Sequence, residues 1–131
     1  MKLSSRFLVD SLFVVAGAFL AVIALAWTAG LAGWTAFGVF TGITVIAAAS
    51  AALARRGSVR FGHGLISVVA LWSLIAALTF SGPALTWLVF ADAIAVGLLA
   101  LADLAVHEAT TERIVHSLEV HEPAADSRLV A

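Results

Sequence analysis

Hydrophobic residues gather in four long runs that are separated by shorter polar or glycine-containing stretches. The runs cover residues 7–27, 34–54, 61–80 and 85–106. A helix needs about 20 predominantly apolar residues to cross the hydrocarbon core of a bilayer, and each run is about that long. None of the runs has the polar face that a helix on the surface of a soluble protein carries. The pattern therefore predicts an all-α fold, a bundle of four transmembrane helices.

The composition of the chain agrees with a membrane protein. Of its 131 residues, 63% are hydrophobic and 11% are charged, whereas a soluble domain is roughly half apolar and a quarter charged. The net charge of −1 gives no basic surface for nucleic acid. The chain has no cysteine, which excludes disulfides and thiolate metal ligands. We therefore expect the protein to be embedded in a lipid bilayer and not to bind nucleic acid.

The basic residues predict how the helices are oriented. All seven lie outside the two short connections, 28–33 and 81–84, at Lys2, Arg6, Arg55, Arg56, Arg60, Arg113 and Arg128. Cytoplasmic loops are enriched in Lys and Arg, so we expect both termini and the basic connection, residues 55–60, on the cytoplasmic side of a bacterial inner membrane. An aromatic belt at the outer interface would then be formed by Trp27, Trp34 and Trp87.

Residues 24–26, Ala-Leu-Ala, resemble the cleavage site of a secretory signal peptide. The first run is long for the hydrophobic core of a signal peptide, and it contains Asp10. It also resembles a later run of the chain. We therefore expect the first run to be retained as a membrane span, with cleavage as the alternative.

The two halves of the chain resemble each other. Phe7 aligns with Phe61 and, after one deletion, Trp34 aligns with Trp87. Each unit would be a hairpin of two helices, and two spans return the chain to the same side, so the repeats would be parallel. The expected order is a first hairpin, a basic connection, a second hairpin, an amphipathic cytoplasmic helix and a mobile tail, in residues 1–54, 55–60, 61–106, 107–122 and 123–131.

The second hairpin contains the sequence LWSLIAALTFSGPALTW, residues 71–87, followed by an apolar helix with a glycine. This stretch resembles one unit of the SPW-repeat family of small bacterial membrane proteins. The Ser-Pro-Trp tripeptide that names the family is absent, and Ala76-Ala77-Leu78 stands roughly where it would be. The resemblance implies a membrane-embedded helical architecture and no catalytic activity.

Small residues recur at a spacing of four in the first two runs. The second run contains Gly38 and Gly42, and the first contains Gly17 and Ala21. This spacing lets two helix backbones approach closely inside a membrane, where lipid provides no hydrophobic driving force between helices. We expect these residues to pack the helices of the bundle against one another. A contact with another subunit is the alternative.

The fourth run carries two aspartates, Asp92 and Asp103, which lie on one face of a helix because eleven residues are close to three turns. At about 1.5 Å per residue from Trp87, Asp103 lies near the cytoplasmic boundary. We expect Asp103 to pair with His107, and Asp10 near the same boundary to pair with Arg6 one turn earlier. The two pairs would form a structural layer of ion pairs. We expect Asp103→Asn to change assembly and folding little.

Asp92 lies about 8 Å deep by the same count, where a charged side chain costs ~2.5–3.5 kcal/mol. No basic residue of the chain reaches its depth, and the neutral donors there are Thr41, Trp72 and Ser73. Three explanations stay open: a protonated, internally hydrogen-bonded acid, a cation from another subunit, or a proton relay. A relay needs titratable groups between Asp92 and Asp103, and the sequence has none there. We predict that Asp92 marks a contact surface.

No motif for catalysis or metal binding is present. The histidines, His63, His107, His116 and His121, occur without an HExxH or paired ExxH pattern, and the chain has neither a phosphate-binding loop nor a GxSxG sequence. We therefore expect no catalytic residue, no metal site and no cofactor. The predicted function is a non-catalytic accessory or scaffold subunit of a larger membrane complex. The alternative is a homo-oligomeric transporter or channel component in which Asp92 lines a polar path with Thr41, Thr44 and Ser73.

Overall fold

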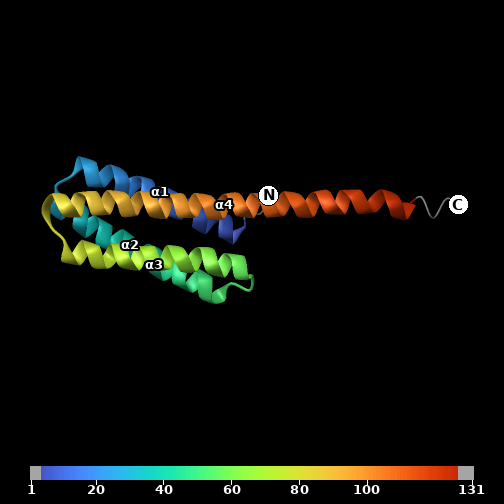
Figure 1. Cartoon of the computed structure of the whole chain (residues 1–131), viewed down its shortest axis with the longest axis horizontal. Coiled ribbons are helices and arrows are strands. Elements are labelled where there is room, and N and C mark those ends of the chain that lie inside the picture. Colours follow the sequence, from blue (N-terminus) through green and yellow to red (C-terminus); the bar gives the residue numbers. More distant parts are fainter. Residues whose placement is uncertain (1–3, 127–131) are drawn as a thin grey trace.

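Four helices make up the computed structural model, which describes the backbone of residues 4–126 and the side chains of residues 4–113. They are α1 (Ser5–Ala26), α2 (Ala29–Leu53), α3 (Gly57–Thr79) and α4 (Gly82–Asp126), as Figure 1 shows. Each contains a stretch that is long and apolar enough to cross a membrane. The predicted fold class, an all-α bundle of four membrane-spanning helices, is confirmed.

The helices are longer than the apolar runs, and their connections are correspondingly shorter. Between α1 and α2 only Trp27 and Thr28 are outside a helix, although the sequence pointed to a connection over residues 28–33. The basic connection is also shorter than residues 55–60, because α3 begins at Gly57. Unpaired backbone groups are costly in or near lipid, so the chain stays helical up to the tightest turns that its geometry allows.

The helices do not pack mainly as the two predicted hairpins. α1 packs most extensively against α4, and α2 against α3, while α1 and α2 share a smaller contact. α3 also contacts α4, whereas the backbones of α1 and α3 stay apart. The division into hairpins of residues 1–54 and 61–106 stays a prediction about the order of the spans, and the most extensive helix contacts cross it. A short connection fixes which helices follow one another, but close packing depends on where small residues let backbones approach.

Gly17 is the point of close approach between α1 and α4. A Cβ atom at this position would lie 2.8 Å from the carbonyl oxygen of Ala93 and 3.2 Å from Cα of Gly97. Ala21, one turn further along α1, is 8% exposed and belongs to the core. Gly17 and Ala21 therefore both lie on the buried side of α1.

Gly38 and Gly42 behave differently. A Cβ atom on either residue would meet nothing within 4 Å, and Gly38 is exposed. Neither glycine therefore marks a close approach of two helices within the described part of the chain, and the alternative, a contact with another subunit, stays a prediction. The reason is the rotation of α2, which buries a different stripe, made of Ala32, Ala36, Phe40, Ile43 and Ala47. On the face with the two glycines, Gly38 is exposed and Gly42 is partly exposed.

The interior of the bundle is apolar along most of its length. Its largest buried apolar side chains, each at most 2% exposed, are Phe13, Leu20, Phe40, Ile66, Val89 and Val96. Large apolar side chains also cover the outside, where Val22 is 66% exposed and Leu98 is 61% exposed. An apolar exterior is unfavourable in water and suits the acyl chains of a bilayer. The chain is a multi-pass membrane protein.

α4 continues far beyond the ends of the other helices (Figure 1). It continues as helix through residues 107–122, for which the sequence predicts an amphipathic helix, and it ends at Asp126. The predicted tail, residues 123–131, therefore begins as helix. Pro123 removes one backbone hydrogen bond, which bends a helix without always ending it. Residues 127–131, and most side chains of the predicted amphipathic segment 107–122, lie outside the described part of the chain.

Candidate functional site

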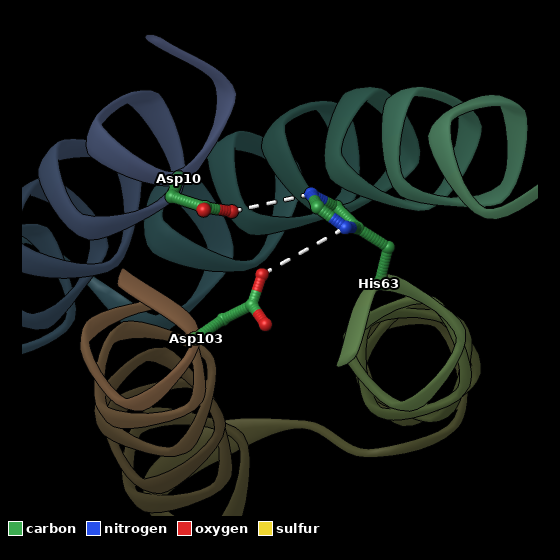
Figure 2. A group of neighbouring side chains, drawn as sticks. All are labelled: Asp10, His63 and Asp103. Atoms are coloured by element: carbon green, nitrogen blue, oxygen red, sulfur yellow. Dashed lines mark ion pairs between the residues drawn. The ribbon is translucent and has the colours of Figure 1, made fainter. Parts of the chain in front are cut away.

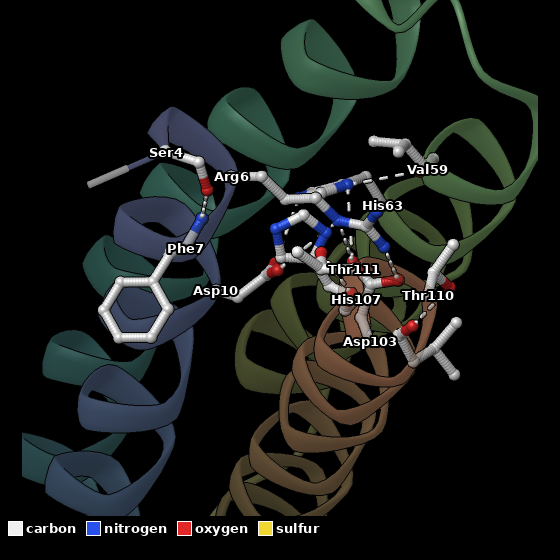
Figure 3. A network of polar contacts seen from close by, with 11 residues as sticks. Ser4, Arg6, Phe7, Asp10, Val59, His63, Asp103, His107, Thr110 and Thr111 are labelled. Carbon is white, nitrogen blue, oxygen red and sulfur yellow. Dashed lines mark hydrogen bonds and ion pairs between the residues drawn. The ribbon is translucent and has the colours of Figure 1, made fainter. Parts of the chain in front are cut away.

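Four polar side chains meet inside the bundle at the end where α1 and α3 begin (Figures 2 and 3). They are Arg6 and Asp10 of α1, His63 of α3 and Asp103 of α4, and we call them the polar cluster. Asp10 and His63 are each about 8–9 Å from the start of their helix at 1.5 Å per residue, so they lie at one level. Asp10, His63 and Asp103 are 0%, 1% and 9% exposed. The two carboxylates and the imidazole are therefore largely buried between the helices that supply them.

Arg6 and Asp103 form the closest contact in the cluster. Nη2 of Arg6 donates to Oδ1 of Asp103 at 2.6 Å, and Nε donates to Oδ2 at 3.3 Å. Two parallel contacts between a guanidinium and a carboxylate make a strong, directional pair. The predicted pair of Arg6 with Asp10 is present only as a longer contact of 3.8 Å. Arg6 therefore links α1 to α4 instead of acting only within its own helix.

His63 lies between the two carboxylates (Figure 2). Its Nδ1 is 3.2 Å from the carbonyl oxygen of Val59, one turn earlier, and 3.8 Å from Oδ2 of Asp103. The other ring nitrogen, Nε2, is 3.2 Å from Oδ1 of Asp10. The ring also packs edge-on against Phe13, with ring centroids 6.2 Å apart. The imidazole is thus held by α1, α3 and α4 together.

Three buried polar atoms in the cluster have no hydrogen-bond partner of good geometry. They are both carboxylate oxygens of Asp10 and Nε2 of His63. Leaving a buried polar group without a hydrogen bond costs about 1–3 kcal/mol, and more for a charged group. Native proteins satisfy most buried polar groups, so these atoms call for a physical explanation.

Gly62 makes room for Asp103 beside α3. A Cβ atom at position 62 would lie 2.5 Å from Oδ1 and 3.0 Å from Cγ of Asp103. Any other residue would push the carboxylate away from α3 and from His63. The absence of a side chain at Gly62 is therefore part of how three helices bring the cluster together.

An open hollow of about 290 Å³ leads to the cluster from the end of the bundle. Arg6 and His63 form part of its wall, and the rest of its lining comes from Ser5, Val9, Ser50, Leu53, Ala54 and Val59. The hollow gives small ligands or water a route to two members of the cluster.

The structure corrects the predicted partners of Asp103. Among the described side chains, its ion pairs are with Arg6 and His63 and not with His107. The described ion pairs also leave out Arg55, Arg56 and Arg60 of the predicted basic connection. Asp103 is buried between α1 and α3, whereas the carbonyl of His107 accepts a bond from Thr111 within α4. The predicted layer of ion pairs exists, but its members come from three helices.

Asp92 stands apart from the polar cluster, partly buried on α4. No cation contacts it among the described side chains, and its polar neighbour is Ser73 of α3. Ser73 donates its own hydrogen bond to the carbonyl of Val69 at 2.8 Å. The other two predicted donors are turned elsewhere: Thr41 donates to the carbonyl of Phe37, and Trp72 is 56% exposed.

His63 is the member of the cluster that sequence reasoning missed. It forms no motif with neighbouring residues, because its partners are on α1 and α4. Counting residues from the helix start would have placed it at the level of Asp10, but not on the same side of the bundle. Its side chain is one of the largest that are fully buried. The sequence around an isolated histidine does not show whether its side chain is buried.

Comparisons of the chain with known protein families, with curated proteins and with solved structures find no match. The class, a multi-pass membrane protein, therefore rests on the four helices themselves.

Proposed function

We propose that the chain is a non-catalytic accessory or scaffold subunit of a larger complex in a bacterial inner membrane. The observation that carries the proposal is Asp92, a carboxylic acid at membrane depth without a cation from the described chain. Asp92 is ten residues from the first residue of α4, or about 15 Å along the helix. A carboxylate at such a depth is costly unless it is paired or hydrogen-bonded.

The contrast with Asp103 strengthens this argument. Asp103 is satisfied within the chain by the guanidinium of Arg6. The hydroxyl next to Asp92, on Ser73, already donates to a backbone carbonyl. A Lys or Arg of a neighbouring subunit would give Asp92 the partner that Arg6 gives Asp103. Ala91, next to Asp92, and Ile94, two residues beyond it, are exposed, so another helix can reach this part of α4.

The uncovered glycines of α2 lie at a similar depth. Gly38 is nine residues from the start of α2, about 14 Å along the helix, and α2 and α4 start at the same end of the bundle. Small residues at this spacing favour close helix contacts in membranes. Together with Asp92, they support a partner that packs against the middle of the bundle.

The extension of α4 supports a further contact outside the membrane. The basic residues favour a cytoplasmic location for both termini and for residues 54–56 between α2 and α3. In this orientation α4 projects into the cytoplasm. Glu108 and Glu112 are exposed on this extension, and acidic residues there favour a protein partner over the anionic inner leaflet.

A transporter or channel component is the alternative function, and it has less support. A polar path through the bundle would need side chains that face it. Thr41 and Thr44 donate to carbonyls of their own helix, at 2.7 Å in both cases. Ser73 does the same. The hydroxyls that would have to line the path are therefore already used inside the helices.

Native mass spectrometry of the tagged chain, extracted from its own membrane in a mild detergent, tests the proposal. We expect a complex that contains a second membrane protein in a fixed ratio. A chain that is recovered only alone or with copies of itself would overturn the proposal, and a pure homo-oligomer would favour the transporter or channel alternative.

A further inference from the structure

We propose that the polar cluster binds a divalent transition-metal ion such as Zn²⁺, with Asp10, His63 and Asp103 as its ligands. One ligand atom from each of these residues can be chosen so that all three lie within 4.8 Å of one another. Two carboxylates and one imidazole are ligands that Zn²⁺, Mn²⁺ and Fe²⁺ accept. The site does not depend on whether the chain belongs to a larger complex.

The separation of His63 and Asp10 fits two ligands of one ion. Zinc–nitrogen and zinc–oxygen bonds are about 2.0–2.2 Å long, so two ligand atoms at a tetrahedral angle are about 3.3–3.5 Å apart. Nε2 of His63 and Oδ1 of Asp10 are 3.2 Å apart, close to that separation. Neither atom has a hydrogen-bond partner, although both are buried. Two unpaired acceptors that face each other at this distance repel unless a cation or a proton lies between them.

The backbone prepares His63 for this role. Its Nδ1 lies 3.2 Å from the carbonyl oxygen of Val59 in hydrogen-bonding geometry, which places the ring proton on Nδ1. Nε2 then carries the free electron pair and points toward Asp10. Histidines that bind metals commonly donate their second ring N–H to a carbonyl in this way, because the bond fixes the tautomer and the ring orientation.

Arg6 and Gly62 allow the third ligand to join. Arg6 holds Asp103 by two contacts, and this keeps one carboxylate oxygen of Asp103 within 4.8 Å of the ligand atoms of Asp10 and His63. Gly62 leaves the space beside α3 in which this carboxylate lies. The two carboxylates carry two negative charges and Arg6 carries one positive charge, so a cation in the site offsets the negative charge that remains. The hollow beside Arg6 and His63 gives the ion a way in.

Calorimetric titration of Zn²⁺ into the full chain, stripped of metal with a chelator and kept in detergent, tests the site. We expect one ion per chain with a Kd in the micromolar range or tighter. Asp10→Asn and His63→Asn should each weaken binding at least about a hundredfold. The matched control is the double variant His107→Asn/Glu108→Gln, which removes an imidazole and a carboxylate from the projecting part of α4 and should bind as the unchanged chain does. No binding by the unchanged chain, or loss of binding only in the control, would overturn the proposal.

A second measurement does not depend on loss of function. The chain has no cysteine, so His63→Cys places a single thiolate in the site. With Co²⁺ as the probe, this variant should gain a sulfur-to-cobalt charge-transfer band in the near ultraviolet, which the unchanged chain lacks. A folded His63→Cys protein without the band would overturn the assignment of His63 as a ligand. If that variant does not fold, the visible Co²⁺ spectrum of the unchanged chain decides, because bands of the hexahydrated ion alone would mean that no site exists.

Discussion

The guanidinium of Arg6 binds the carboxylate of Asp103 in a bidentate pair, with nitrogen–oxygen distances of 2.6 and 3.3 Å between residues 97 positions apart. The pair joins the first turns of α1 to α4 and closes the polar cluster from one side. The side chains of Arg6 and Asp103 are only 14% and 8% exposed. Removing one partner would therefore leave the other charge largely buried and uncompensated.

Asp103→Asn should destabilise the isolated protein. Breaking a buried pair by removing one partner costs ~3–5 kcal/mol. We expect a loss of stability at the lower end of this range, because the Arg6 side chain is partly exposed and its freed charge can be solvated at the end of the bundle. Thermal unfolding followed by circular dichroism in detergent measures the effect. The control is Glu108→Gln, which removes an exposed carboxylate from the same helix. Equal melting temperatures for the two variants would contradict the structural role of the pair.

Two glycine variants should differ sharply in the stability of the isolated chain. In Gly17→Ala the new methyl group would lie 2.8 Å from a backbone oxygen of α4, so the helices must separate, at a cost of about 1–3 kcal/mol. In Gly38→Ala the methyl group meets nothing, and the better helix propensity of alanine should leave stability unchanged or raise it by up to about 1 kcal/mol. Thermal unfolding of both variants in one detergent measures the difference, and a Gly38→Ala protein that is the less stable of the two would show that the packing is assigned to the wrong face.

The orientation of the helices can be measured with single cysteines, because the chain has none of its own. Ser58 and Ser81 are exposed near opposite ends of α3. With both termini in the cytoplasm, Ser81→Cys should react with a membrane-impermeant thiol reagent in intact cells, and Ser58→Cys should react only after the cells are opened. The reverse pattern of labelling would mean that the protein has the opposite orientation.

The fold could be predicted as far as the helices, because length and apolarity alone determine them. Helix ends were less accurate: Gly30 and Gly33 looked like a connection, yet both are inside α2. In lipid a continuous helix satisfies the backbone even where glycine would weaken it in water. The pairing of α1 with α4 could not be predicted, because all four helices are apolar around most of their surface and only the spacing of small residues distinguishes one face from another.

The candidate site, like the fold, could be predicted only in part from the sequence. Residue counting placed Asp10 and Asp103 near one end of the bundle, and it predicted a layer of ion pairs there. It assigned Arg6 to Asp10, because residues four apart on a helix are neighbours. The observed partner, Asp103, is reached only through the packing of α1 on α4. His63 could not be assigned to the polar cluster from the sequence. Its partners are on α1 and α4, and the sequence does not determine how these helices are arranged around α3.

Asp92→Asn tests most directly whether Asp92 meets a cation of another subunit. Asparagine keeps the size and the hydrogen-bonding capacity of the side chain but not the charge. The matched control is Thr44→Val, which removes a polar group from the membrane part of α2 whose hydroxyl bonds only to its own helix.

The measurement is the amount of partner protein that co-purifies with tagged chain in mild detergent, with thermal unfolding of the isolated chain recorded in parallel. We predict that Asp92→Asn weakens assembly by about 3 kcal/mol or more, which is over a hundredfold in affinity, while the isolated chain stays as stable as the Thr44→Val control. Full assembly of the Asp92→Asn protein would contradict the account and would leave Asp92 as an internal, protonated and hydrogen-bonded residue.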